Sequence, residues 1–180
     1  MKGQIIRERY EATCDSYDEL YRAEQYEKYF VALKDTRPKG IVLDAGCGTG
    51  LLAEFMYSYG LLDEVDRYFC IDYSRCMAEI ALWRLGVLCP EKCVVVMGDL
   101  EDLPLPARSV DVTYSFTVLD LLDEPERGIE EILRVTRGRA IVSLMKALNL
   151  KDRLVTRHRL VGSTSKDVIL ELRRPTLLPP

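Results

Sequence analysis

The sequence predicts an α/β fold built on a mainly parallel sheet, and three observations support this prediction. Short runs rich in Val and Ile alternate along the chain with segments of helical periodicity. A glycine-rich turn, GCGTG at 46–50, directly follows the first of these apolar runs. Two aspartates, Asp72 and Asp99, stand at the ends of the next two runs. A parallel sheet gathers such groups at the carboxyl ends of its strands, where α/β proteins bind their ligands.

Seven strands are expected. Each is a short run enriched in β-branched or aromatic residues and bounded by charged residues, Gly or Pro, as buried strands usually are. In chain order they cover residues 41–44, 67–71, 93–97, 110–115, 140–144, 160–161 and 167–172.

The expected helices lie ahead of the first strand and between the strands. One covers about residues 18–33, and a second follows the glycine turn. A third is capped by Ser74 and closed by Gly86, and a fourth has Pro125 in its first turn. The segment 148–160 has no clean period, and helix is favoured for its first part.

The 180 residues fit one domain of ordinary size. We expect a cap helix region at 1–37, a core at 38–174 and a tail at 175–180. No apolar run reaches membrane-spanning length, and the charged start, MKGQIIRERYEATC, lacks the apolar stretch of a secretory signal. A cytoplasmic protein is therefore expected, with no membrane partner.

Six cysteines occur along the chain, against a single histidine. Cys89 and Cys93 are half of a zinc-type motif with no second half, so no metal is expected. We expect mainly buried or free thiols, with a Cys89–Cys93 disulfide as the alternative. Low Asn and Gln content, and 17 Arg against 8 Lys, give the composition a thermophile-like character.

Charge is unevenly distributed, although the net charge is only −4. From Arg134 onward there are 11 Lys and Arg against 3 Asp and Glu, whereas the preceding residues hold 14 against 26. Two interpretations stay open. The basic part faces an anionic partner such as RNA, or the two parts pack together and neutralise each other.

The glycine turn predicts a ligand site, because backbone amides at a helix start can face a ligand that approaches the chain closely. Its spacing is D-x-G-x-G-x-G, and Leu51 stands where a dinucleotide-binding turn has its third glycine. No lysine follows, as a phosphate loop requires. Asp72 is placed to accept hydrogen bonds from ribose hydroxyls, and Asp99 is placed to accept one from an exocyclic amine. The pattern therefore favours a nucleoside without phosphates.

The stretches VLDAGCGTG, IDYSRCMAEIA, GDLEDLPLPARSVDVTYS and GRAIVSL resemble the class I S-adenosylmethionine-dependent methyltransferases in order and spacing. The likeness covers about residues 41–144 and the final strand, and it is nearest to small members of methyltransferase type 11. It implies a Rossmann-like fold, with a mainly parallel seven-stranded sheet, an antiparallel last strand and helices on both faces. S-adenosylmethionine is then the cofactor, and S-adenosylhomocysteine the product.

The resemblance also implies the cofactor contacts. The turn holds the methionine end, Asp72 the ribose and the residues around Asp99 the adenine, while SYDELYRAEQYEKY resembles a covering helix. The implied set is Tyr17, Tyr21, Asp44, Ala45, Gly46, Cys47, Gly48, Gly50, Asp72, Tyr73, Gly98, Asp99, Leu100 and Ser115. The catalytic group is unknown, with Asp120 and Tyr17 as weak candidates.

The methyl acceptor stays open between a small molecule and an RNA or translation component. Transfer of a sulfonium methyl needs alignment more than a nucleophile, so no catalytic motif need appear. A small activator subunit, as in some archaeal relatives, or a homodimer is a further expectation. The alternative function is a non-catalytic subunit that binds S-adenosylmethionine or S-adenosylhomocysteine, or a scaffold, within a methyltransferase complex.

Overall fold

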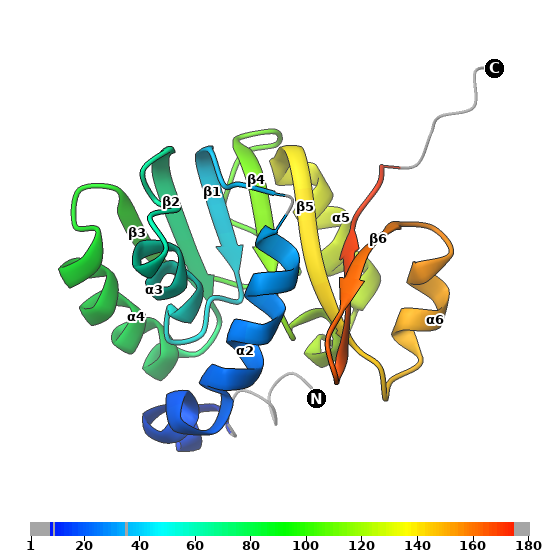
Figure 1. Ribbon diagram of the computed structural model, residues 1–180, viewed down its shortest axis with the longest axis horizontal. Helices are drawn as coiled ribbons and strands as arrows, with labels where there is room; N and C mark the ends of the chain where they lie inside the picture. Colours follow the sequence, from blue (N-terminus) through cyan, green and yellow to red (C-terminus); the bar gives the residue numbers. More distant parts are fainter. Residues whose placement is uncertain (1–7, 9, 35, 175–180) are drawn as a thin grey trace.

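The computed structural model describes residues 8, 10–34 and 36–174, and the expected tail at 175–180 lies outside them. Its centre is a seven-stranded sheet with the strand order β3-β2-β1-β4-β5-β7-β6 (Figure 1). Strands β1 to β5 run parallel to one another, whereas β7 is antiparallel to both β5 and β6. The seven-stranded sheet that the family resemblance implies, with its antiparallel last strand, is confirmed.

All seven expected strands are present. Their bounds are β1 Gly40–Ala45, β2 Val65–Asp72, β3 Cys93–Met97, β4 Val110–Ser115, β5 Thr136–Met145, β6 Arg159–Ser163 and β7 Asp167–Glu171. β5 begins four residues earlier than expected, within a charged stretch. Its register with β4 shifts between Val110 and Val112, and a Cβ on Gly138 would meet the Asp111 carbonyl oxygen at 2.3 Å. Glycine at this position therefore lets the irregular start of β5 join the sheet.

The helices are η1 Cys14–Ser16, α2 Tyr17–Leu33, α3 Leu51–Ser58, α4 Arg75–Leu88, η2 Leu119–Leu121, α5 Pro125–Val135 and α6 Leu150–Val155. The Ser74 cap of α4 is confirmed, since its hydroxyl accepts a hydrogen bond from the Met77 amide. The expected end at Gly86 is wrong. Gly86 does not adopt the positive φ of a glycine stop, and the helix continues to Leu88.

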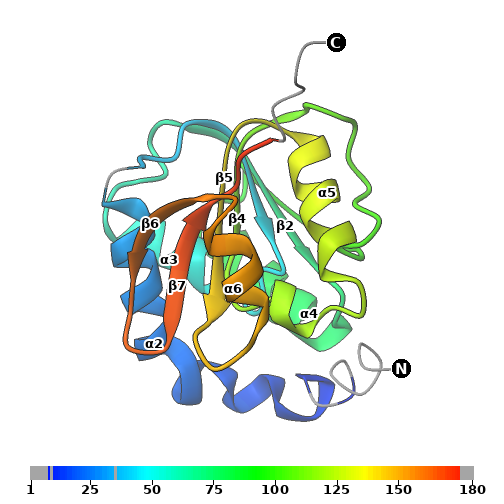
Figure 2. The ribbon, with the colours of Figure 1, turned by 90° about the vertical axis from the view of Figure 1, so that its right-hand side faces the viewer.

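Helices cover both faces of the sheet. Figure 2 shows α2 and α3 on one side and α5 on the other. The alternation of strand side chains explains this arrangement, since Val42 packs in the α2–α3–α4 core and its neighbour Leu43 in the opposite one. No helix links β3 to β4, and the loop at 98–109 covers β1 and β2 with Leu100 and Leu103. A loop therefore takes the place of a helix over this part of the second face.

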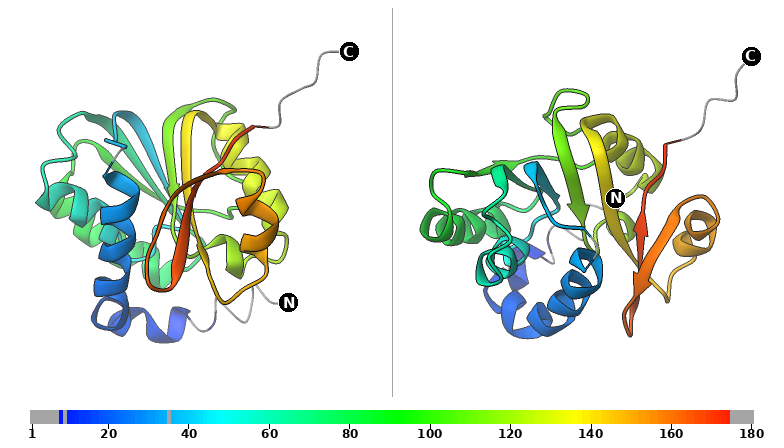
Figure 3. Two further views of the ribbon diagram at one scale, coloured as in Figure 1. Left: turned by 45° about the vertical axis from the view of Figure 1, so that its right-hand side comes forward. Right: turned by 45° about the horizontal axis from the view of Figure 1, so that its top comes forward.

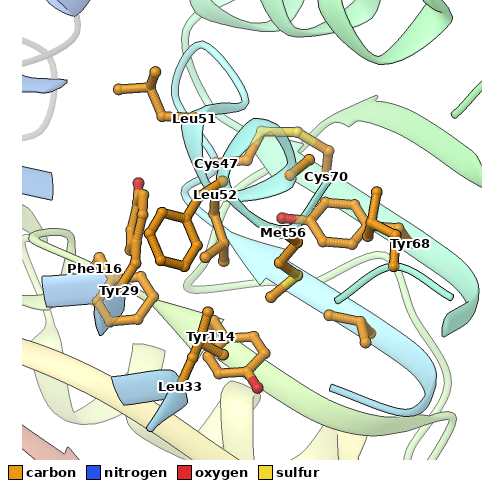
Figure 4. Close-up of a cluster of buried hydrophobic side chains, with 14 of the residues drawn as sticks. Tyr29, Leu33, Cys47, Leu51, Leu52, Met56, Tyr68, Cys70, Tyr114 and Phe116 are labelled. Carbon is orange, nitrogen blue, oxygen red and sulfur yellow. A yellow bond between two sulfur atoms is a disulfide. The ribbon is translucent and has the colours of Figure 1, made fainter. Parts of the chain in front are cut away.

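The six cysteines form three disulfides, Cys14–Cys76, Cys47–Cys70 and Cys89–Cys93. The expectation of mainly free thiols is wrong, and the alternative Cys89–Cys93 pair is confirmed. The turn explains one unexpected pair, because the amides of Gly46 and Cys47 both donate to the Ile71 carbonyl, which holds Cys47 close to Cys70 at the end of β2. Figure 4 shows this disulfide among the buried side chains of the first core.

Several basic residues of the C-terminal part pair with acidic ones of the earlier part. Arg137 pairs with Asp111, and Lys166 pairs with Glu24 on α2. Helix α2 packs against β6 and β7, which lie at one edge of the sheet (Figure 3). These contacts favour the interpretation in which the two parts neutralise each other. Within the described ranges, no helix has the length and apolar character needed to span a membrane.

Candidate cofactor site

The glycine turn at 46–50 joins β1 to α3 and is fixed by its own backbone. The amides of Gly46 and Cys47 donate to the Ile71 carbonyl at 2.7 and 3.1 Å, and Gly50 donates to Cys47 at 3.0 Å. The Cys47–Cys70 disulfide adds a covalent link to β2. The turn is therefore held against the end of β2 before any ligand is present.

Two glycines of the turn have different roles. At Gly46, φ is +79°, and a Cβ would lie 2.3 Å from a methyl group of Val118. The missing side chain at Gly46 therefore makes room for Val118 and not for a ligand. At Gly48, φ is +54°, and a Cβ would lie 3.9 Å from the Tyr17 ring. Gly48 is thus the glycine that leaves open space beside the backbone.

Charged side chains join the turn to three helices. Arg84 of α4 donates to the Thr49 carbonyl at 2.6 Å and pairs with Glu54 of α3 at 3.0 Å. Arg84 also pairs with Asp18 of α2, whose carboxylate accepts the Thr49 hydroxyl at 2.6 Å. Arg84 and Asp18 thereby fix the flank of the turn from both sides.

A cavity of about 310 Å³ lies in front of the turn, within the usual range for small-ligand pockets. The sheet ends, the segment ahead of α2, the start of α4 and the chain after β4 together enclose it. The sequence-predicted residues that line it are Tyr17, Gly46, Gly48, Asp72, Tyr73, Asp99 and Leu100.

Other predicted residues lie outside the lining. Gly50 is the N-cap of α3 and packs against Leu85, and Gly98 packs against Ile71 and Pro104. Ala45 is buried with Leu43 in the core on the opposite face of the sheet from α2, α3 and α4, and Cys47 is held in its disulfide. These residues shape the cavity from behind.

Asp44, Ser115 and Tyr21 also lie behind or beside the cavity. Asp44 accepts a hydrogen bond from the Tyr68 hydroxyl at 2.8 Å, and burial raises the pKa of its carboxyl to about 7. Ser115 is fully buried. Tyr21 stacks at a tilt on Tyr17, with 5.0 Å between ring centroids.

The two catalytic candidates separate clearly. Asp120 is buried away from the cavity, and its carboxylate accepts the Met145 amide at 2.7 Å. Tyr17 lines the cavity, and its hydroxyl accepts a hydrogen bond from the Gln25 amide group at 3.1 Å. Burial raises the pKa of Tyr17 above its ordinary value, so this hydroxyl stays protonated near neutral pH.

Much of the cavity wall was not predicted. The missed residues are Tyr10, Ser74, Met77, Glu101, Phe116, Thr117, Val118, Leu121, Leu122 and Asp123. Those from 116 to 123 directly follow β4, and their place after a third strand end was the available signal. Thr117 adopts φ +62°, which is uncommon for a β-branched residue. No feature of the sequence predicts this conformation.

Acidic groups dominate the charge of the cavity. Asp72, Asp99, Glu101 and Asp123 line it, and the described lining contains no Lys, Arg or His. Asp72 accepts the Gly48 and Ser74 amides at 2.8 and 2.9 Å. Burial outweighs these hydrogen bonds and raises the pKa of its carboxyl. Such a wall suits a neutral or cationic ligand and repels phosphates.

The fold and this cavity define a class of protein: a Rossmann-like α/β protein with an acidic cavity at its strand ends, where α/β proteins bind their ligands. The sequence comparison names the family. Residues 43–144 match the family model described as "Methyltransferase domain", which covers more than half of the chain. The chain belongs to this family of class I, S-adenosylmethionine-dependent methyltransferases.

A curated relative agrees with this assignment, and a solved structure shares the fold. A demethylmenaquinone methyltransferase of Symbiobacterium thermophilum is 31% identical over 150 residues, covering 76% of this chain and 56% of the relative. The magnesium protoporphyrin IX methyltransferase ChlM of Synechocystis PCC 6803, solved with bound S-adenosylmethionine, has a TM-score of 0.69 at 19% identity and covers 95% of this chain and 96% of its own.

A further solved structure is the Haloferax volcanii putative methyltransferase in complex with the activator Trm112. It has a TM-score of 0.65 at 22% identity, and the match covers 75% of this chain and 59% of that chain. The two solved structures share the fold with this chain. The chain spans about half the length of the curated relatives that it matches.

Proposed function

We propose that this chain transfers a methyl group from S-adenosylmethionine to a small molecule at the described cavity. One observation carries the proposal. An open glycine, Gly48, and two strand-end carboxylates, Asp72 and Asp99, face one cavity whose described lining has no basic residue. That combination fits an adenosyl sulfonium, which is cationic and has no phosphate, better than a dinucleotide.

The lining residues take the following proposed roles. Asp72 accepts the ribose hydroxyls, and it has capacity left, because each carboxylate oxygen accepts more than one hydrogen bond. Asp99 and Leu100 meet the adenine edge, and Tyr73 lies against its face. The turn at 45–50 receives the methionine end. When bound, S-adenosylmethionine supplies a methyl group on an excellent leaving group.

Alignment and exclusion of water are then the main tasks of the chain. Phe116 and Val118 form an apolar wall after β4, beside Gly46. Tyr17 closes the opposite side as a protonated hydroxyl, so it positions groups by hydrogen bonding and does not act as a base. Asp120, outside the lining, supports the backbone of β5.

Electrostatics favour a small, neutral or cationic acceptor. An RNA backbone would meet four lining carboxylates without a cation among the described lining residues. Among the C-terminal basic residues, which could have provided a docking face for an anion, several are engaged in ion pairs, namely Arg137, Arg139, Arg153 and Lys166. The relative from Symbiobacterium and the neighbour from Synechocystis are both named for small-molecule substrates.

A partner protein is also proposed. The Haloferax volcanii neighbour was solved with an activator, which supports an activator subunit here, and a homodimer is the other arrangement. Light scattering on the purified chain distinguishes a homodimer, which has twice the mass of the chain. A monomer that gains methyl-transfer activity only with an added activator supports the first arrangement.

Binding of S-adenosylmethionine and S-adenosylhomocysteine, measured by calorimetry, tests the proposal. Asp72→Ala should weaken both by about 1.5–3 kcal/mol, the scale of charge-assisted hydrogen bonds. Asp66→Ala, an exposed aspartate at the other end of β2, is the matched control and should leave affinity unchanged. Equal affinity of wild type and Asp72→Ala would show that the ribose is held elsewhere.

Transfer of a radiolabelled methyl group into fractionated cell extract identifies the acceptor class. Label in the small-molecule fraction supports the proposal, and label in RNA or protein overturns its acceptor. Tight binding without transfer into any fraction would favour a non-catalytic subunit.

A further inference from the structure

The segment ahead of α2 forms one wall of the cavity. Tyr10 lines the cavity from this segment and Tyr17 from the first position of α2, and their rings meet edge to face with centroids 6.1 Å apart. The wall opposite is the start of α4, where Ser74 and Met77 line the same cavity. In Figures 1 and 2 this segment crosses the end of the sheet toward which the β1 arrow points.

Two links join these walls. The Glu11 carboxylate accepts the Ser74 hydroxyl at 3.1 Å and the amides of Arg75 and Cys76 at 2.7 and 3.2 Å, so it caps α4. The second link is covalent. The Cys14–Cys76 disulfide ties η1 to the first turn of α4, with a Cα–Cα distance of 6.2 Å. Each cysteine lies within four residues of two lining residues of its own wall.

We propose that the Cys14–Cys76 disulfide is a redox-operated strap that keeps the cavity closed and slows entry and exit of the cofactor. The idea rests on the proposed function, since the cofactor must use this cavity. With the disulfide formed, the wall bearing Tyr10 and Tyr17 cannot swing away from α4. With the disulfide reduced, the covalent link is lost and non-covalent contacts such as those of Glu11 remain. The segment that bears Tyr10 then becomes a lid hinged at the start of α2, where Asp18 stays paired with Arg84 of α4.

The redox step needs a dithiol reductant. A thiolate of the reductant attacks the sulfur of Cys76, which is only half-buried, whereas Cys14 is buried. A mixed disulfide forms and the Cys14 thiolate leaves. The second thiol of the reductant then displaces Cys76. Two electrons pass from the dithiol to the protein, which gains two thiols, and the reductant departs as a disulfide.

The other disulfides do not join two walls of the cavity. Cys47 and Cys70 are both buried beneath the turn, where a reductant has poor access. Cys89 and Cys93 are four residues apart beyond the end of α4. Loss of either pair would leave Tyr10 and Tyr17 linked to α4, so reduction of Cys14–Cys76 alone should change access.

Dissociation of radiolabelled S-adenosylhomocysteine, chased with unlabelled ligand, measures the effect. Dithiothreitol should speed dissociation about tenfold or more, which corresponds to about 1.4 kcal/mol removed from the opening barrier. Alkylation and peptide mapping then establish that Cys14 and Cys76 were the thiols released. A chelator is included, because the two sulfurs and the Asp15 carboxylate lie close enough together to take a metal ion once reduced.

Two double variants separate the strap from general loosening. Cys14→Ser/Cys76→Ser should dissociate fast with or without dithiothreitol, and Cys89→Ser/Cys93→Ser should keep the response. Equal rates in oxidised and reduced wild type, with binding intact, overturn the strap alone. So does a response that disappears only in the Cys89→Ser/Cys93→Ser variant. Absence of binding in both redox states overturns the proposed function and the strap with it.

Discussion

The cofactor half and the C-terminal half of this molecule are stabilised differently. All three disulfides lie between residues 14 and 93, around the glycine turn and α4, and the sequence has no cysteine beyond Cys93. From β5 onward, ion pairs connect the elements instead, including Arg139 and Arg159 with Glu171. Cross-links restrict the unfolded chain and are indifferent to salt, whereas ion pairs depend on pH and salt. The half that contains the cavity and the glycine turn is therefore the covalently restrained one.

The strongest test of the C-terminal half is its buried ion pair. Lys28 of α2 and Asp167 of β7 are both fully buried, with 3.2 Å between Nζ and Oδ2. Lys28 also donates to the Thr117 hydroxyl at 2.6 Å, next to the cavity. Lys28→Met removes the buried cation that pairs with Asp167 and, at 3.0 Å, with Glu24. It should lower the free energy of unfolding by about 3–5 kcal/mol, measured in urea.

The matched control is Lys166→Met. Lys166 also pairs with α2, through Glu24, but its side chain is 69% exposed, so the expected loss is below about 1 kcal/mol. Lys28→Met/Asp167→Asn should recover part of the loss, because the uncompensated charge is gone. If Lys28→Met and Lys166→Met lowered the free energy of unfolding by similar amounts, burial of the Lys28–Asp167 pair would not increase its contribution to stability.

The cofactor half should be most sensitive at its buried disulfide. Cys47→Ala/Cys70→Ala opens a link over 23 residues and should cost about 3 kcal/mol by the loop-entropy relation. The Cys89→Ala/Cys93→Ala control spans 4 residues and should cost less. Thermal unfolding without reductant measures both. A larger loss for the short link would argue that local packing, not chain restriction, sets the stability of this half.

Local sequence patterns predict some features of this molecule and miss others. Strands such as β3 and β4 were predicted with their observed bounds, because a short apolar run bounded by polar residues predicts a buried strand from neighbouring residues alone. The end of α4 was misplaced, since a glycine stops a helix only in a left-handed conformation. Two disulfides and the wall at Thr117 and Val118 depend on strand register and on contacts distant in sequence. Such tertiary contacts leave no local pattern to recognise.

The Asp44 carboxyl beneath the turn should give stability a distinct pH dependence. Burial raises its folded-state pKa to about 7, despite the hydrogen bond from Tyr68. With a raised pKa, its contribution is complete below the unfolded value and is lost as pH rises toward 7. Wild type should therefore lose about 2 kcal/mol between pH 5 and 7 relative to Asp44→Asn, whose amide oxygen still accepts from Tyr68.

Urea unfolding of both proteins at several pH values measures this difference directly. Groups that titrate in both proteins cancel in the comparison, so the remaining slope belongs to Asp44. Parallel stability curves for wild type and variant from pH 5 to 7 would show that the carboxyl titrates below this window, as a solvated aspartate does.

The smallest expected effect is at the surface of the C-terminal half. The carboxylate of Glu171 in β7 forms an ion pair with Arg139 at 2.9 Å and a second ion pair with Arg159. Burial acts to raise its pKa, but hydrogen bonds from both arginines outweigh it and leave the pKa lowered. Because the group is only partly buried, Glu171→Gln should cost at most about 1 kcal/mol.

Salt should separate this pair from the cross-linked half. The cost of Glu171→Gln should shrink between about 0.1 M and 1 M salt, as the screening length falls from about 10 Å to about 3 Å. The cost of Cys47→Ala/Cys70→Ala should stay constant over the same range, because no charge is removed. Glu130→Gln, at an exposed position of α5, controls for the change in net charge. A salt-independent cost at Glu171 would mean that packing of its side chain, rather than its charge, joins β7 to β5 and β6.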